Sequence, residues 1–160
     1  PGGLDSARRT IVQTLRRARL PGFVSVAPEG ARAASAGVFI TMAAHVAAMA
    51  PATDIGAAHP VSLEGELPET LEAKVVNEAA SYIRTIAERR GRNVQWAEDA
   101  VRKSLSLTAQ EALEQDVIDL VARDLDDLLR QLDGQEVETA WGSITLKTGG
   151  SSPASRARSS

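Results

Sequence analysis

Ser35 is the residue of this chain whose surroundings are best suited to nucleophilic chemistry. It stands in "GARAASAG", residues 30–37, where small neighbours leave room for a substrate to approach. A serine at a strand-to-helix turn, beside backbone amides without partners, can attack a carbonyl group. The same stretch also fits a tightly packed helix start in which Ser35 is only a cap, since the G-x-S-x-G motif is absent.

Two helix starts could supply backbone donors to a reacting carbonyl oxygen. The segment "PGG", residues 1–3, leads into a predicted helix, and the first amides of a helix have no acceptor within it. The amide of Ala36 holds the same position in the next helix. If amides of these two segments converge near the Ser35 hydroxyl, they form an oxyanion hole, in which one donor lowers the barrier by about 3 kcal/mol.

Lys74 and His59 are the candidate bases, because a serine hydroxyl needs a base to be nucleophilic at neutral pH. Lys74 lies in "EAKVV", and a lysine buried among apolar neighbours loses its proton more readily. The alternative is a solvated lysine that pairs with Glu78 one turn along the helix. His59, in "GAAHPV", is either the rival base or a loop histidine that hydrogen-bonds the backbone. His45 stands among alanines and is expected to be a packing or helix-end residue.

The pattern of the chain predicts strands that alternate with helices, which favours an α/β fold. Residues 54–67 hold several Gly and Pro residues and are expected to be a loop. Thr108 and Glu111 have the spacing of a capping box. Helices are expected at residues 6–18, 34–43, 70–90, 93–104 and 124–132, strands at 23–27, 46–50 and 117–122, and a hairpin at 136–147 with its turn at 141–143.

Other conspicuous residues have structural interpretations. The arginines of residues 89–93 are expected to form a solvated helix end, and residues 124–127 an acidic helix start without the spacing of a calcium loop. On the first helix, Ile11, Val12 and Leu15 are expected on one face and the arginines on the other. Trp96 and Trp141 are expected to be packing anchors.

Composition excludes several classes of function. The 160 residues contain no cysteine, which removes disulfides, thiol catalysis and cysteine metal sites. The net charge is −3 and the basic residues are scattered, so no nucleic-acid-binding surface is expected. The longest apolar stretch, residues 38–52, is too short and too weak to span a membrane. We expect no cofactor and no metal ion.

Four segments in order resemble one protein family closely, over most of residues 1–146. They are "PGG", "GARAASAGVFITMAAHVAAMAPATDIGAAHPV", "AKVVNEAASYIRTIAERRGRNVQWAEDAVRKSLSLTAQEAL" and "VIDLVARDLDDLLRQLDG". They look like the N-terminal protease domain of the NfeD family of membrane-anchored serine proteases of the Clp-protease class. The resemblance implies the Clp protease/crotonase fold of repeated ββα units and a Ser–Lys dyad in place of a triad.

The resemblance also implies roles for individual residues. Ser35 matches the family's nucleophile and Lys74 its general base, while Gly2 and Ala36 match the oxyanion amides, with Gly3 adjacent. Family members cleave hydrophobic segments of stomatin-like membrane proteins and tend to be dimers. We therefore expect a stomatin-like substrate, a homodimer, and a full-length protein that is anchored in a membrane with this soluble part on the extracytoplasmic side.

Two departures from the family pattern shape these expectations. The family domain begins with a strand and a helix upstream of "PGG", so residues 1–147 are expected to be a protease domain without its first strand and helix. Residues 148–160, rich in Ser, Gly and Arg, are expected to be a disordered linker. His59 follows Ser35 by 24 residues, close to the triad histidine of soluble Clp-type subunits, so a Ser35–His59 arrangement is an alternative.

Two other classes of function remain open. A crotonase-like acyl-CoA enzyme would use two amides for an oxyanion but carboxylates for acid and base. Neither Asp nor Glu occurs in residues 30–37, which argues against that class. A non-catalytic scaffold domain that binds membrane-protein segments would need no activated serine.

Overall fold

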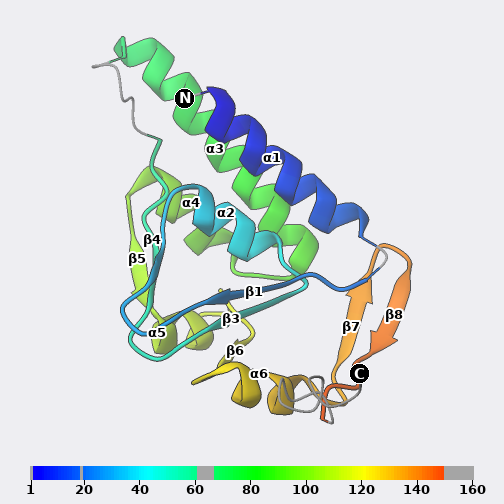
Figure 1. The fold of residues 1–160 in the computed structure, drawn as a ribbon. Helices are drawn as coiled ribbons and strands as arrows, with labels where there is room; N and C mark the ends of the chain where they lie inside the picture. Colours follow the sequence, from blue (N-terminus) through cyan, green and yellow to red (C-terminus); the bar gives the residue numbers. More distant parts are fainter. Residues whose placement is uncertain (1, 19, 61–66, 150–160) are drawn as a thin grey trace.

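The chain folds into two small sheets, a hairpin and a layer of helices (Figure 1). This computed structural model describes residues 2–18, 20–60 and 67–149. The helices are α1 (Gly2–Arg17), α2 (Ala36–Ala43), α3 (Glu69–Arg90), α4 (Val94–Arg102), α5 (Ala109–Glu114) and α6 (Leu125–Leu132). The strands are β1 (Phe23–Val26), β2 (Arg32–Ala33), β3 (Val46–Met49), β4 (Asp54–Gly56), β5 (Ser106–Thr108), β6 (Leu120–Val121), β7 (Glu136–Thr139) and β8 (Gly142–Thr145).

The sheets differ in the direction of their strands. One has the order β1-β3-β6 and is parallel throughout. The second has the order β2-β4-β5, in which β4 runs parallel to β2 and antiparallel to β5. Strand β3 is buried at all four positions, as expected for the central strand of a parallel sheet between helices. The hairpin β7–β8 forms a separate two-stranded unit.

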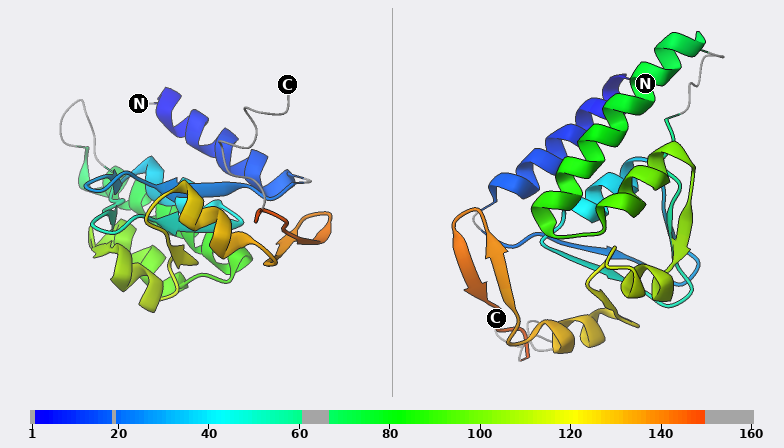
Figure 2. Two further views of the ribbon diagram at one scale, coloured as in Figure 1. Left: turned by 60° about the horizontal axis from the view of Figure 1, so that its bottom comes forward. Right: turned by 180° about the vertical axis from the view of Figure 1, so that it is seen from behind.

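Helix α2 is the centre of the packing. It contacts α1, α3, β1 and β2, and most of its side chains are buried. Helices α1 and α3 run alongside each other over it (Figures 1 and 2). The core around α2 has few aromatic residues and is built largely from alanine and valine, with Phe39, Met42, Met49 and Ile83 as its large members.

The alternation of strands and helices is confirmed, and so is the capping box of Thr108 and Glu111. The expectation of a loop from residue 54 is wrong at its start, because residues 54–56 form β4, and β2 and β5 were not expected either. These strands have two or three residues, too few for a period-two pattern, and only their partners define them. Residues 61–66 of the expected loop lie outside the described residues.

Three expectations about side chains need correction. Trp96 is buried, at 5% exposure, but Trp141 is 64% exposed, because the hairpin turn at residues 140–141 carries it outward. Ile11 is exposed, whereas the guanidinium of Arg8 lies 4.2 Å from the centre of the Phe39 ring, so the arginines of α1 are not confined to the outer face. The third correction concerns two arginines at the C-terminal end of α3, and it is given with the site below.

Candidate active site

Ser35 lies in a strained turn between β2 and α2. Its backbone has φ 51° and ψ −119°, in the region that favours glycine, which costs about 1–3 kcal/mol for another residue. The amide of Ser35 donates to the Ala57 carbonyl at 2.9 Å, and its carbonyl accepts from the Val38 amide at 3.1 Å. Hydrogen bonds on both sides of the residue therefore hold the strained conformation, and the Ser35 side chain is exposed.

The capping interpretation of Ser35 is wrong. Its side chain makes no capping hydrogen bond to α2, although the residue occupies the N-cap position. The Gly37 amide donates instead to the Ala34 carbonyl at 2.9 Å. Ala36 is the first residue of α2, so its amide has no acceptor within the helix. The Ser35 hydroxyl is therefore not used to cap α2.

Strand β4 supports this turn from the side. It pairs with β2 in the register Arg32 to Asp54 and Ala33 to Ile55, and the bond from Ser35 to Ala57 continues that pairing. Gly56 precedes Ala57 with φ +115°. A Cβ at Gly56 would lie 2.3 Å from the Leu105 carbonyl oxygen of the adjoining segment. The close approach that positions Ala57 therefore requires glycine.

The C-terminal end of α2 is closed by two arginines, Arg90 at the last position of α3 and Arg92 just after it. Arg92 is 6% exposed and donates to the carbonyls of Met42 at 3.0 Å and Ala44 at 2.7 Å. Arg90 donates to the Ala43 carbonyl at 2.8 Å. The expectation that this arginine run is a solvated helix end is therefore wrong for Arg90 and Arg92, which satisfy three successive carbonyls of another helix.

Arg92 also ties the helix to the parallel sheet. Its guanidinium lies 3.0 Å from a carboxylate oxygen of Asp119, and that oxygen accepts from the Ala47 amide of β3 at 2.7 Å. Burial, followed by the charges of neighbouring arginines, lowers the pKa of Arg90. The end of α2 away from Ser35 is therefore held by a network of polar groups around the buried Arg92 guanidinium.

Lys74 lies in the second turn of α3, and its side chain is exposed. The expected burial is not present, because Ala73 is exposed and Val75 and Val76 are only half-buried. The alternative ion pair with Glu78 is also absent from the described part of the chain.

His59 faces the helices α3 and α4. Its Nδ1 lies 2.8 Å from the Val101 carbonyl, so this nitrogen carries the proton and donates it. Its Nε2 lies 3.8 Å from a carboxylate oxygen of Glu72, on the first turn of α3. Nδ1 therefore has a hydrogen-bond partner in Val101, while Nε2 only lies near Glu72, and neither contact involves Ser35.

His45 has the packing role expected of it. Its Nδ1 accepts from the Gly22 amide at 2.8 Å, which leaves Nε2 as the protonated nitrogen in the neutral ring, buried and without a hydrogen-bond partner. Burial, and then the charges of Arg90 and Arg92, lower the pKa of His45.

The predicted site residues come from three neighbouring helices. Gly2 and Gly3 are the first residues of α1, Ser35 and Ala36 begin α2, and Lys74 is near the start of α3. The three helices run in the same general direction, so their N-terminal ends lie toward the same end of the helix layer (Figures 1 and 2).

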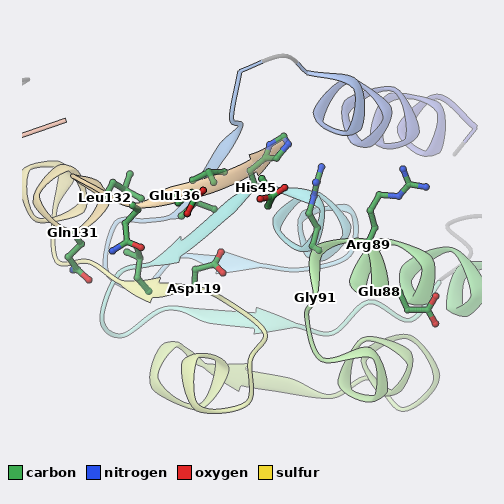
Figure 3. Close-up of a pocket in the computed structure, with 14 residues that line it drawn as sticks. His45, Glu88, Arg89, Gly91, Asp119, Gln131, Leu132 and Glu136 are labelled. Atoms are coloured by element: carbon green, nitrogen blue, oxygen red, sulfur yellow. The ribbon is translucent and has the colours of Figure 1, made fainter. Parts of the chain in front are cut away.

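A cavity of about 650 Å³ lies elsewhere, between the C-terminal end of α3, the start of β3 and the hairpin (Figure 3). His45, Glu88, Asp119 and Glu136 are among its lining residues, and none of the predicted site residues is. Within residues 2–18, 20–60 and 67–149, no group of three His, Cys, Asp or Glu side chains could hold a metal ion.

Comparisons with known proteins add independent information. The chain is 41% identical over 140 residues to the membrane-bound protease PH1510 of Pyrococcus horikoshii, which covers 86% of this chain and 32% of that protein. It thus spans about a third of the length of the curated relative. No family model matches the chain.

Solved structures decide the assignment. A Lys→Ala variant of the 1510-N membrane-bound stomatin-specific protease, in complex with a substrate peptide, matches with a TM-score of 0.80 and 37% identity over 89% of this chain and 67% of that one. A Ser→Ala variant of the same protease matches with a TM-score of 0.78 and 37% identity, over 89% and 70%.

The chain belongs to the 1510-N protease family. This confirms the NfeD-like resemblance and the Clp-protease-like α/β fold expected from the sequence. The two solved 1510-N variants replace a Ser and a Lys of that protease. The number of residues between that Ser and Lys differs by two from the number between Ser35 and Lys74 in this chain. In the described part of this chain, no helix combines the length and the apolar character needed to cross a membrane.

Proposed function

We propose that this chain is the catalytic part of a membrane-bound serine protease, with Ser35 as the nucleophile and Lys74 as the general base. The observation that carries the proposal is the strained Ser35 backbone at a strand-to-helix turn, with a side chain that caps nothing. Such strain persists only where the surroundings impose it, and it is concentrated at active sites. The 1510-N variants support the same two residue types.

In the reaction, Lys74 accepts the Ser35 proton as Oγ attacks a peptide carbonyl. The negative oxygen of the tetrahedral intermediate is held by the amides of Gly2 and Ala36, with Gly3 adjacent. Lys74 then protonates the leaving amine and later activates the water that hydrolyses the acyl-enzyme. Since Lys74 is exposed without substrate, the bound apolar peptide supplies the exclusion of water that favours a neutral amine.

The partners of His59 favour Lys74 as the base. A triad histidine presents one nitrogen to the serine and the other to an acid. The Nδ1 of His59 donates to the Val101 carbonyl of α4 rather than to an acid, and its Nε2 lies nearest Glu72 of α3. We assign His59 to the support of α3 rather than to proton transfer.

We propose that the substrate is a hydrophobic segment of a stomatin-like membrane protein, bound as an extended strand along the border formed by residues 54–68. The whole protein acts as a homodimer that is attached to the membrane by parts outside this chain, with the protease on the extracytoplasmic side. The protease domain extends to about residue 147 and a linker follows it. Thr148 and Gly149, the first residues of the expected linker, still donate backbone hydrogen bonds to Asp133 at 2.9 and 3.0 Å, and residues 150–160 lie outside the described structure.

The test is labelling by a fluorophosphonate probe together with cleavage of a peptide from a stomatin-like protein, both followed by mass spectrometry in the full-length protein. Ser35→Ala should abolish labelling and cleavage. Lys74→Ala should reduce both nearly as much, whereas Lys103→Ala, which removes another exposed lysine, should have little effect. If Lys74→Ala kept most of the activity and His59→Ala lost it, the triad would replace the dyad. An unlabelled Ser35 would favour an acyl-CoA enzyme or a scaffold.

A further inference from the structure

The end of the molecule opposite Ser35 carries a surface with a distinctive composition. Trp141, at the tip of the β7–β8 hairpin, is 64% exposed, and Leu20, just after α1, is 75% exposed. The hairpin tip and the end of α1 lie side by side in every view of Figures 1 and 2. The indole nitrogen of Trp141 lies 3.4 Å from the Arg17 carbonyl, which confirms that the two segments meet.

Arginines surround the exposed tryptophan. A hollow of about 570 Å³ is lined by six residues, of which three are arginines and none is acidic. They are Gln13, Arg16, Arg17, Arg89, Ala140 and Trp141. Burial is the main cause of the lowered pKa of Arg90, followed by the charge of Arg92, and the charges of Arg89 and Arg16 add to it.

The neighbouring hollow extends the same positive surface. It runs between α1 and α3, and Arg9, Arg16 and Arg89 line it, with Glu78 as its one acidic member. A chain with a net charge of −3 thus gathers four arginines, Arg9, Arg16, Arg17 and Arg89, along one side of the α1–α3 layer. Arg9 also stacks on the Tyr82 ring, with its guanidinium carbon 4.4 Å from the ring centre.

Tryptophan beside basic residues is the pattern found where proteins meet the lipid headgroup region. The indole ring prefers the boundary between water and hydrocarbon, and arginines are attracted to anionic headgroups. An acidic protein surface would match the arginines but would not by itself favour the exposure of large apolar side chains such as Trp141 and Leu20.

We propose that the surface formed by Arg16, Arg17, Leu20, Arg89 and Trp141 docks on an anionic phospholipid bilayer. The hairpin tip and Leu20 enter the headgroup layer, while the arginines lie against the phosphates. Because α1, α2 and α3 begin at the other end of the layer, Ser35 at the N-cap of α2 lies toward the end away from the bilayer. The inference concerns orientation on the membrane and does not depend on peptidase activity.

The test uses the 160-residue chain with Trp96→Phe, which leaves Trp141 as its only tryptophan. Trp96 is buried and its indole nitrogen has no hydrogen-bond partner, so phenylalanine is a mild replacement. Titration with phosphatidylglycerol vesicles at low salt should shift the Trp141 emission to shorter wavelength. Phosphatidylcholine vesicles should produce no shift, and 0.5 M salt should reverse the effect.

A pair of matched double variants decides which surface binds. Arg16→Gln with Arg17→Gln should weaken vesicle binding about 25-fold, since each basic residue near an anionic surface contributes about five-fold. Arg123→Gln with Arg130→Gln removes the same charge from exposed sites around α6 and should leave binding unchanged. Both variants keep residues 150–160, so that segment contributes equally. Equal weakening by both pairs, or no association with anionic vesicles, would overturn the proposal; the latter result would assign the surface to an acidic protein.

Discussion

The two ends of α2 are opposites in how their polar groups are satisfied. At its C-terminal end, Arg90 and Arg92 cover three successive carbonyls, and Arg92 is almost completely buried. At its N-terminal end, Ser35 is exposed, strained and does not cap the helix. One end contributes stability, and the other uses some of that stability to hold a strained backbone at the proposed nucleophile. A stable scaffold behind a strained turn is the arrangement expected of a preorganised nucleophile.

Substitution of Ser35 has the largest expected effect on the N-terminal end. Ser35→Ala and Ser35→Gly should each lower peptide cleavage on the order of 10⁴-fold or more, because the nucleophile is gone. The two variants should differ in stability. Ser35→Gly should raise the free energy of unfolding by about 1 kcal/mol, because glycine tolerates φ 51°, while Ser35→Ala should stay within about 0.5 kcal/mol of the parent. Urea unfolding measures both, and a destabilised Ser35→Gly would show that the turn is not strained.

Loss of Arg92 has the largest expected effect on the C-terminal end. Arg92→Met should lower the free energy of unfolding by about 3 kcal/mol, because the carbonyls of Met42 and Ala44 lose their buried donor. The matched control is Arg102→Met on α4, where an exposed guanidinium pairs with Glu98, and its cost should be below about 1 kcal/mol. Chemical denaturation distinguishes them; similar values would mean that the network after α3 is no stronger than a surface ion pair.

Substitution of Gly56 tests whether β4 supports the Ser35 turn at the N-terminal end of α2. Gly56→Ala should lower the free energy of unfolding by about 2 kcal/mol or more, because the new Cβ would collide with the Leu105 carbonyl and φ is +115°. It should also lower cleavage activity, since Ala57 holds the Ser35 amide. Gly91→Ala is the control, with positive φ but open space around it, and should cost about 1 kcal/mol without loss of activity. A fully active Gly56→Ala variant would argue against the role of β4 in positioning Ser35.

The smallest expected effect concerns His45, beside the arginine network. Its pKa is lowered in the folded chain, so the unfolded chain binds a proton first as the pH falls below about 6.5. The stability that the neutral ring contributes is therefore present above that pH and is lost as the pH falls toward the folded pKa. His45→Asn should flatten the dependence of the free energy of unfolding on pH between 7 and 5.5. An unchanged slope would place the titrating group elsewhere.

The sequence by itself predicted the helices other than α5, the strands of the parallel sheet and the placement of Ser35 among small residues. These features depend on local periodicity and on residue size, which a single chain displays directly. The family motifs added Lys74 and the oxyanion amides, which local patterns alone left open beside their structural alternatives.

Only the tertiary structure decided what the short strands and the arginines do. Strands β2, β4 and β5 are too short to show a pattern, and they exist because neighbouring segments supply hydrogen bonds. Arg90 and Arg92 looked like a solvated helix end, yet their acceptors are carbonyls some fifty positions earlier in the chain. Trp141 was expected inside and lies outside, since hydrophobicity alone does not determine which side of a hairpin tip faces the core. In each case the deciding partner is distant in sequence, and only the folded chain brings it near.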